Sequence, residues 1–260
     1  MIRSAGLLIA LLVVGCSPDP TPAATEPLVP EAPAVPVVRS LSAPVGWLVD
    51  RLAPTGIDHV CVLPPDADPS TWRPAGDLVV QLAQADLIIA NGAGYEPWTV
   101  TASLPSTRLI DTSRGLPLIE HDVQTHSHGP GSEEHAHGEV DPHIFLDPGL
   151  FGRQATRVAA ALKTVVADDL AVDARLQTLQ AELDALGQEW DDALRSQTAG
   201  AHRDWSYLLA RVGREATGGG LDVGPLVMIG RAGVGSYDYL DRSRAAIARV
   251  RGAGAGATGE

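Results

Sequence analysis

From Val37 onward, short apolar segments alternate with amphipathic segments of helical length, and this alternation limits the possible folds more than any other feature. The apolar segments predict strands at 37–41, 59–63, 86–90 and 108–111. The segments between them predict helices at 44–52 and 74–85, each of which opens with a proline that suits a first helical turn. Strands that alternate with helices form mainly parallel sheets, so the sequence predicts an α/β fold.

Two longer helices are predicted beyond this region, at 151–167 and 172–194. The second carries apolar residues at spacings of three and four, which are typical of a helix face packed in a core: Leu176, Leu179, Leu183, Leu186, Trp190 and Leu194. After residue 214 the chain is rich in glycine, and only a strand at 226–229 and a helix at 237–250 are predicted there.

The N-terminal segment has the pattern of an export signal. Arg3 is followed by an apolar stretch at 5–14, which is too short to cross a hydrocarbon core of about 30 Å. The residues before Cys16 resemble the lipobox of bacterial lipoproteins, and this resemblance implies a lipid on Cys16 that anchors the chain to the membrane. Residues 17–36 contain seven prolines and predict an extended tether. We therefore expect a cell-envelope protein, in the periplasm or on the outer face of the membrane.

Charge and cysteine content exclude several classes of partner and scaffold. The formal net charge of −13 opposes binding to nucleic acid or to an anionic membrane surface, because both are negative. The chain has two cysteines, Cys16 and Cys61, and lipidation of the first leaves none with which the second can form a disulfide.

Five of the eight histidines lie at 121–139, among Ser, Gly and Glu residues that predict a loop without regular structure: His121, His126, His128, His135 and His137. Imidazole is a common ligand of zinc, copper and nickel at neutral pH. A flexible loop must lose conformational entropy for each ion it binds, so these histidines predict weak and exchangeable metal binding.

Two other histidines lie next to rigid or aromatic segments. His143 lies between two Asp-Pro pairs in the sequence DPHIFLDP at 141–148, and by itself it can be a metal ligand or a residue that only hydrogen-bonds within the turn. His202 precedes the segment WSYL at 205–208, and the same two interpretations apply to it.

Several motifs together resemble one family, the zinc and manganese solute-binding proteins of ABC importers. DPHIFLDP resembles the family motif DPHxWLDP, and His202 with Tyr207 resembles its HxxxxY segment. LPPDADP at 63–69 is similar to a PPGxDP turn, and further matches occur at ADLIIANG (85–92) and YEPW (95–98). The histidine-rich loop also lies where the family carries one, and the resemblance extends over about residues 37–213.

The resemblance implies two α/β lobes joined by a long helix, with the ion bound between the lobes by His143 and His202. The family places a further histidine after the DP of the PPGxDP turn, and here that position is Ser70. Its carboxylate ligand comes from a segment that this chain lacks, so the second lobe is expected to be shortened. Loop histidines, water or a carboxylate must complete the ligand set, and the candidate carboxylates are Glu96, Asp68 and Asp238.

The expected organisation has five parts: the signal peptide (1–16), the tether (17–36), the N-terminal lobe (37–148), a helical region with the linking helix (149–197), and a shortened C-terminal lobe (198–260). We expect a monomer that captures Zn²⁺ rather than Mn²⁺, because imidazoles dominate the candidate ligands. The chain carries neither a nucleotide-binding GxxxxGK[ST] motif nor multiple membrane spans, so the permease and its ATPase must be separate proteins.

A second interpretation is a degenerate family member that acts as an envelope zinc buffer or metallochaperone without transport. An enzyme is not expected, since the sequence contains no HExxH and no GxSxG motif.

Overall fold

The computed structural model describes residues 35–65, 67–121, 139–195, 207–208 and 238–256, which belong to one compact unit that begins at Val35. The predicted signal peptide, all but the last two residues of the tether, and most of the histidine-rich loop lie outside the described residues. The predicted strand at 226–229 lies outside them as well.

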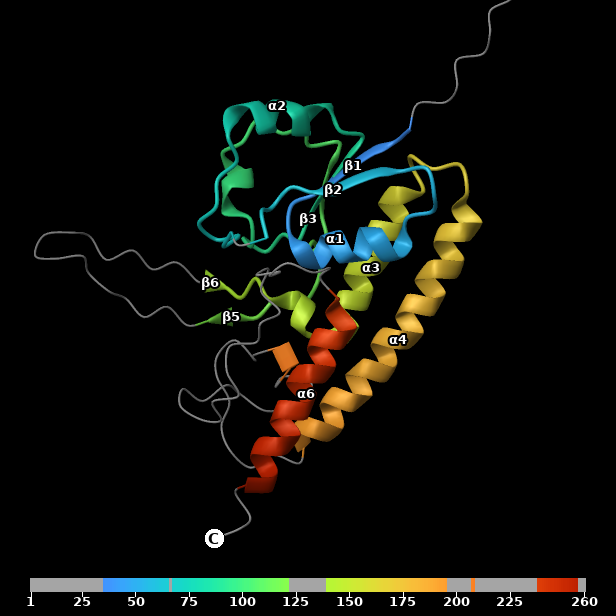
Figure 1. The fold of residues 1–260 in the computed structure, drawn as a ribbon. Helices are drawn as coiled ribbons and strands as arrows, with labels where there is room; N and C mark the ends of the chain where they lie inside the picture. Colours follow the sequence, from blue (N-terminus) through green and yellow to red (C-terminus); the bar gives the residue numbers. More distant parts are fainter. Residues whose placement is uncertain (1–34, 66, 122–138, 196–206, 209–237, 257–260) are drawn as a thin grey trace, which may run out of the picture. The chain divides into compact units, whose positions relative to one another are not determined.

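The N-terminal part is built on a parallel sheet of four strands: β1 (Val37–Ser40), β2 (Asp58–Cys61), β3 (Leu87–Ala90) and β4 (Leu109–Asp111) (Figure 1). Their order across the sheet is β2-β1-β3-β4, and all three pairings are parallel. Every residue of β3 is buried, as expected for a central strand covered on both faces. The predicted α/β fold with a parallel sheet is confirmed.

Helices cover both faces of this sheet. One face packs against α1 (Ala43–Leu52) and α3 (Pro148–Leu162), with α4 (Asp169–Arg195) packed on α3 and α6 (Tyr239–Gly256) packed on α4. The other face packs against α2 (Gly76–Gln84) and the 3-10 helix η1 (Pro97–Val100). A second 3-10 helix, η2 (Ile144–Leu146), leads into α3. The molecule thus has helical layers on either side of one sheet.

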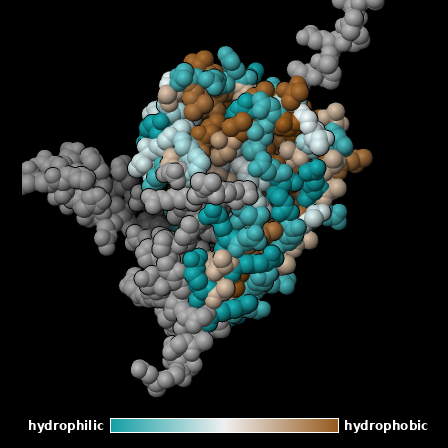
Figure 2. Space-filling view, viewed as in Figure 1, coloured by the Kyte–Doolittle hydropathy of each residue, from teal (hydrophilic) through white to brown (hydrophobic). Residues whose placement is uncertain are grey.

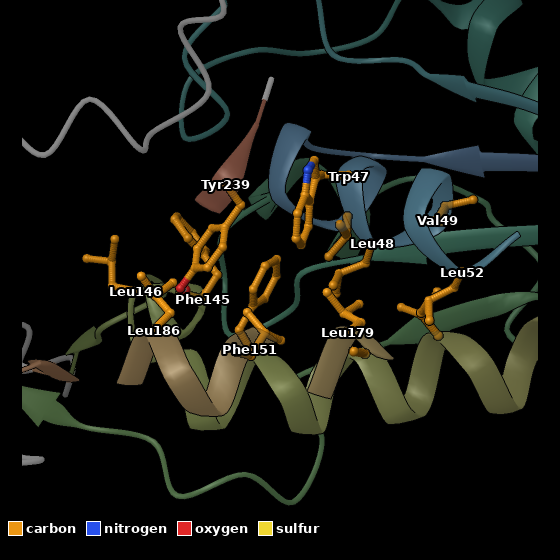
Figure 3. Close-up of a cluster of buried hydrophobic side chains, with 14 of the residues drawn as sticks. Trp47, Leu48, Val49, Leu52, Phe145, Leu146, Phe151, Leu179, Leu186 and Tyr239 are labelled. Carbon is orange, nitrogen blue, oxygen red and sulfur yellow. The ribbon is translucent and has the colours of Figure 1, made fainter. Parts of the chain in front are cut away.

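An aromatic cluster joins the C-terminal helix to the N-terminal part of the chain. The ring of Tyr239, at the start of α6, lies 4.4 Å from that of Phe151 and 5.5 Å from that of Trp47, measured between centroids (Figure 3). The hydroxyl of Tyr239 donates a hydrogen bond of 2.7 Å to the carbonyl of Phe145. These contacts fix the start of α6 against α1, α3 and the segment that contains η2.

The apolar stripe predicted for the long helix is buried in this core along most of α4: Leu179, Leu183, Leu186, Trp190 and Leu194. The side of the molecule over α4 and α6 is mainly hydrophilic, as Figure 2 shows. An amphipathic helix explains both observations. None of the helices in the described part has the length and apolar character that a bilayer span requires.

Helix ends differ from prediction where a side chain caps the first turn. Helix α3 ends at Leu162 rather than 167. It begins at Pro148 rather than 151, because the Asp147 carboxylate accepts a hydrogen bond of 2.9 Å from the backbone N–H of Leu150. Helix α4 begins at Asp169 rather than 172, where Asp168 accepts from the N–H of Ala171 in the same way. Helix α6 continues to Gly256 instead of ending at 250.

The expected second lobe falls mostly at 196–206 and 209–237, outside the described residues. Besides the parallel sheet, the described part contains one antiparallel ribbon, formed by β5 (Glu120–His121) and β6 (Glu139–Val140). This ribbon brackets the predicted histidine-rich loop.

Candidate functional site

The order of the strands places a topological switch point at the carboxyl end of the sheet. Strands β2 and β3 flank β1, so the connections that leave β1 and β3 run in opposite directions. Ligands of open α/β sheets bind where such connections diverge. Here the diverging segments are residues 41–42, between β1 and α1, and the loop 91–96, which follows β3.

A buried carboxylate bridges these two segments. Glu96 is 3% exposed, and its Oε1 accepts hydrogen bonds from the Ser42 hydroxyl at 2.6 Å and the Asn91 N–H at 3.1 Å. Its Oε2 accepts from the N–H of Gly92 at 3.3 Å. Burial raises the pKa of Glu96 to about 7, although these hydrogen bonds favour the charged form and oppose the shift. Ser42 occupies the N-cap of α1 yet makes no side-chain cap, because its hydroxyl is directed to Glu96.

The loop after β3 also presses against the end of β4. Gly92 has a φ of +79°, and a Cβ at this position would lie 1.8 Å from Oδ1 of Asp111. Glycine is therefore required there. The next N–H, of Ala93, donates to the hydroxyl of Ser113 at 2.9 Å. The loop is held on two sides, by Glu96 within it and by the residues that follow β4.

Asn91 connects this loop to the turn that contains His143. Its side chain is fully buried, and Nδ2 donates to the carbonyl of Pro142 at 2.9 Å and to that of Gly92 at 3.0 Å. Its Oδ1 accepts from Nε2 of Gln154, on α3, at 3.1 Å. The amide of Asn91 thus joins β3, α3 and the residue that precedes His143.

His143 is oriented by a buried aspartate. Asp141 is 4% exposed, and its Oδ1 lies 2.9 Å from both the backbone nitrogen and Nδ1 of His143. A carboxylate can only accept hydrogen bonds, so in the neutral imidazole Nδ1 carries the hydrogen and Nε2 keeps its lone pair. A carboxylate–histidine pair of this kind is typical of metal-ligating histidines. The two interpretations of His143 are compatible, since one ring nitrogen bonds within the turn and the other is left with a lone pair.

Aromatic residues surround this turn. The rings of Tyr95 and Phe145 lie edge-on to His143, at 5.8 and 6.0 Å between centroids. Tyr207 donates a hydrogen bond of 2.9 Å to the carbonyl of Asp141 and accepts one of 3.0 Å from the N–H of Ile119. Burial raises the pKa of Tyr207 to about 12, so its hydroxyl stays protonated. The tyrosine of the HxxxxY segment therefore lies directly beside the His143 turn.

The remaining predicted site residues are placed as follows. Asp68 is exposed and accepts from the N–H and hydroxyl of Ser70 at 2.9 and 2.6 Å. Asp238 accepts from the N–H of Asp241 at 2.9 Å, at the start of α6. His121 is described only as a residue of β5. The other predicted site residues lie outside the described ranges: His126, His128, His135, His137, His202 and Cys16.

Within the described ranges, no group of three or more His, Cys, Asp or Glu residues lies close enough together to hold one metal ion. His143 is the histidine of the expected cleft that the structure describes, and Glu96 lies behind its turn with both carboxylate oxygens hydrogen-bonded. A metal site built on His143 would therefore need ligands from beyond this part of the chain or from water.

Sequence reasoning missed the roles of Ser42, Asn91 and Gln154. The polar residues that directly follow the buried strand β3 could have indicated these roles, since Asn91 and Glu96 lie in two motifs that resemble the family. Their partners Ser42 and Gln154 are 54 and 63 positions away along the chain, and no local pattern links them.

The sequence also did not predict a second hydrogen-bonded network, which has the composition of a catalytic triad. Nδ1 of His59 lies 2.7 Å from Asp50, and its Nε2 lies 3.0 Å from the hydroxyl of Ser40. A serine nucleophile must reach a substrate carbonyl, but Ser40 is fully buried beneath α1. These three hydrogen-bonded residues therefore stabilise the packing of α1 on the sheet and provide no site for acyl transfer.

Comparison with known proteins gives a consistent result. The family model described as "Zinc-uptake complex component A periplasmic" matches residues 37–223. The high-affinity zinc uptake system protein ZnuA of Bacillus subtilis (strain 168) is 26% identical over 105 residues, which cover 39% of this chain and 33% of that protein. This chain thus matches about a third of the length of that relative.

Solved structures show the same fold. The metal-dependent lipoprotein YcdH from Bacillus subtilis has a TM-score of 0.59 at 18% identity, covering 70% of this chain and 66% of its own. The solute-binding protein FpvC from Pseudomonas aeruginosa, solved in complex with Mn²⁺, has a TM-score of 0.56 at 21% identity, covering 71% and 68%. The family resemblance inferred from the motifs is confirmed, and the chain belongs to the family of periplasmic zinc-uptake component A.

Proposed function

We propose that this protein is the extracytoplasmic receptor of an ABC importer, which captures Zn²⁺ as its solute and delivers it to a membrane permease. His143 and His202 are the proposed ligands, and the protein acts by binding rather than by catalysis. Mn²⁺ is the less favoured solute, because imidazole nitrogen suits zinc better than the harder manganese ion.

One observation carries this proposal. Nδ1 of His143 is bonded to the buried carboxylate of Asp141, at the end of the sheet where the connections diverge, so Nε2 is the nitrogen left to bind an ion. Tyr207 supports the assignment of His202, because it ends the HxxxxY segment that His202 begins and its hydroxyl donates a hydrogen bond to the carbonyl of Asp141.

The proposed partners are a membrane permease and its ATPase, and the proposed anchor is a lipid. The chain carries no GxxxxGK[ST] motif, so a separate ATPase must power the permease. Cys16 is the proposed site of lipid attachment, and the proline-rich segment 17–36 would allow the binding domain to reach the permease from its anchor.

A second candidate function is a zinc buffer or metallochaperone of the envelope. The observation that favours it is Ser70, which stands where the family motif carries a histidine and whose hydroxyl is bonded to Asp68. A site with fewer protein ligands binds zinc less tightly, and a buffer needs less affinity than a transport receptor.

A zinc competition titration on residues 17–260 tests the proposal. The parent is compared with a deletion of 121–139 and with the double variant His143→Ala/His202→Ala. We expect the double variant to lose the tight site and the loop deletion to keep it.

If only the loop deletion lowers affinity, the cleft is vestigial and the buffer function holds. Absence of zinc affinity in the parent would exclude both candidates. Zinc-limited growth of a strain that lacks the gene then separates a transport receptor from a buffer.

A further inference from the structure

We propose that Asn91 is a positioning residue for the ligand His143: its side-chain amide fixes the carbonyl of Pro142 and thereby sets the direction of the imidazole. This inference rests on the proposed role of His143 in binding zinc. It identifies a residue that was assigned no part in the site by the sequence reasoning.

Asn91 is connected directly to the turn that carries His143. The hydrogen bond from Nδ2 of Asn91 to the Pro142 carbonyl measures 2.9 Å and spans 51 positions along the chain. Pro142 lies between Asp141, which holds the imidazole, and His143 itself. A shift of this carbonyl must rotate the peptide that carries His143, because the proline ring leaves its own φ almost no freedom.

The side chain of Asn91 cannot easily move. Its Oδ1 is held by Gln154, its backbone N–H by Glu96, and its second amide hydrogen by the carbonyl of Gly92. Asn91, Gln154 and Glu96 are all buried. In a buried network, each group that loses its partner costs about 1–3 kcal/mol, so one arrangement is strongly preferred.

The serine at position 70 reduces the number of candidate imidazole ligands. With serine at position 70, a zinc ion gains less from the protein, and the direction of each remaining imidazole matters more. Loss of a group that orients a metal ligand typically lowers affinity by about 10–100-fold. Asn91 acts on the imidazole through the Pro142 carbonyl, whereas Asp141 contacts the imidazole directly.

A double-mutant cycle tests the inference on the chain from residue 17 onward. Zinc affinity is measured by competition for the parent, Asn91→Ala, His143→Ala and the double variant. We expect Asn91→Ala to weaken binding by about 10–100-fold in the parent and to have almost no further effect once His143 is alanine. Ser40→Ala is the matched control, since it also removes a buried hydrogen bond but one made to His59, and it should leave zinc affinity unchanged.

A measurement without metal provides an independent readout. Long-range ¹H–¹⁵N correlation spectra of the zinc-free protein report which ring nitrogen of His143 carries the hydrogen. We expect the Nδ1–H form in the parent and in Ser40→Ala, and a mixture of forms in Asn91→Ala. A role confined to global stability would leave this signal unchanged in the folded protein.

The inference is overturned if the ring-nitrogen signal of His143 is the same in Asn91→Ala as in the parent. It is also overturned if Asn91→Ala lowers zinc affinity by the same factor in the His143→Ala variant as in the parent. If the parent itself binds no zinc, the proposed function fails and the ring signal alone decides whether Asn91 positions His143. Should Asn91→Ala not fold, Asn91→Asp replaces it, because aspartate keeps the acceptor for Gln154 and removes the donor to Pro142.

Discussion

Two Asp-Pro turns in this protein share one local geometry and differ in what surrounds them. In each, an aspartate oxygen accepts from the backbone N–H two residues later, at 2.9 Å in both Asp68-Pro69-Ser70 and Asp141-Pro142-His143. The same oxygen also contacts the side chain of that later residue, at 2.6 Å for Ser70 and 2.9 Å for His143. In the first turn, Asp68 and Ser70 are exposed. In the second turn Asp141 is buried, its carbonyl accepts a hydrogen bond from Tyr207, and the carbonyl of the next residue accepts one from Asn91. The sequence Asp-Pro-X is thus sufficient to form the turn, and long-range contacts make it rigid.

The largest expected effect is a change with pH in the free energy of unfolding, caused by the buried carboxylate of Glu96. The pKa of Glu96 is about 7 in the folded protein against an ordinary 4.5, so the folded state binds its proton more tightly than the unfolded state. The stabilisation is fully present below pH 4.5 and is lost as the pH rises to about 7, by roughly 3 kcal/mol over that range. Urea unfolding at several pH values should show this decline in the parent and not in Glu96→Gln. An equal decline in both proteins would assign it to other groups.

The same substitution made in both turns tests how much their surroundings matter. We expect Asp141→Ala to weaken zinc binding by about 10–100-fold, because the imidazole of His143 loses the group that orients it. Asp68→Ala is the matched control, and zinc competition should show little change for it, since its partner Ser70 has no imidazole. Equal losses in both variants would mean that the exposed turn contributes to the site.

Replacing the third residue of the exposed turn tests whether this turn can contribute a zinc ligand. Ser70→His restores the residue that the family motif carries, and a third imidazole should tighten zinc binding by about tenfold, or ~1.4 kcal/mol. Ser70→Ala should leave affinity as it is. If Ser70→His also has no effect, the first turn does not face the ion, and the two turns are alike in local geometry only.

The smallest effect is expected for the tyrosine that supports the buried turn. Tyr207→Phe keeps the ring and removes the hydroxyl that links the N–H of Ile119 to the carbonyl of Asp141. We expect the free energy of unfolding to fall by about 1 kcal/mol, measured in urea at pH 7. An unchanged value would show that water replaces the hydroxyl.

The sequence predicted those parts of the molecule that depend on local periodicity. The apolar run at 86–90 identified the central strand, and the leucine stripe at 172–194 identified the long helix, because burial follows directly from such patterns. It also singled out His143 through the Asp-Pro turn around it. Glu96 was noticed, but its hydrogen bond to Ser42 joins residues 54 positions apart and depends on how the crossovers place two loops together. The chain Asp50–His59–Ser40 likewise depends on strand register, which no single segment specifies.

The hydrogen bonds of two tyrosines have a consequence for the time at which the binding residue becomes ordered during synthesis. The carbonyls of Asp141 and Phe145, on either side of His143, accept from Tyr207 and Tyr239, which follow them by 66 and 94 positions. A growing chain can pair its four parallel strands once residue 111 is available, but these two supports of the His143 turn are absent until the tyrosines have been made. The sheet can therefore form before the turn has all of its supports, and premature termination upstream of residue 207 would yield a chain in which Asp141 and Asn91 hold the turn without either tyrosine.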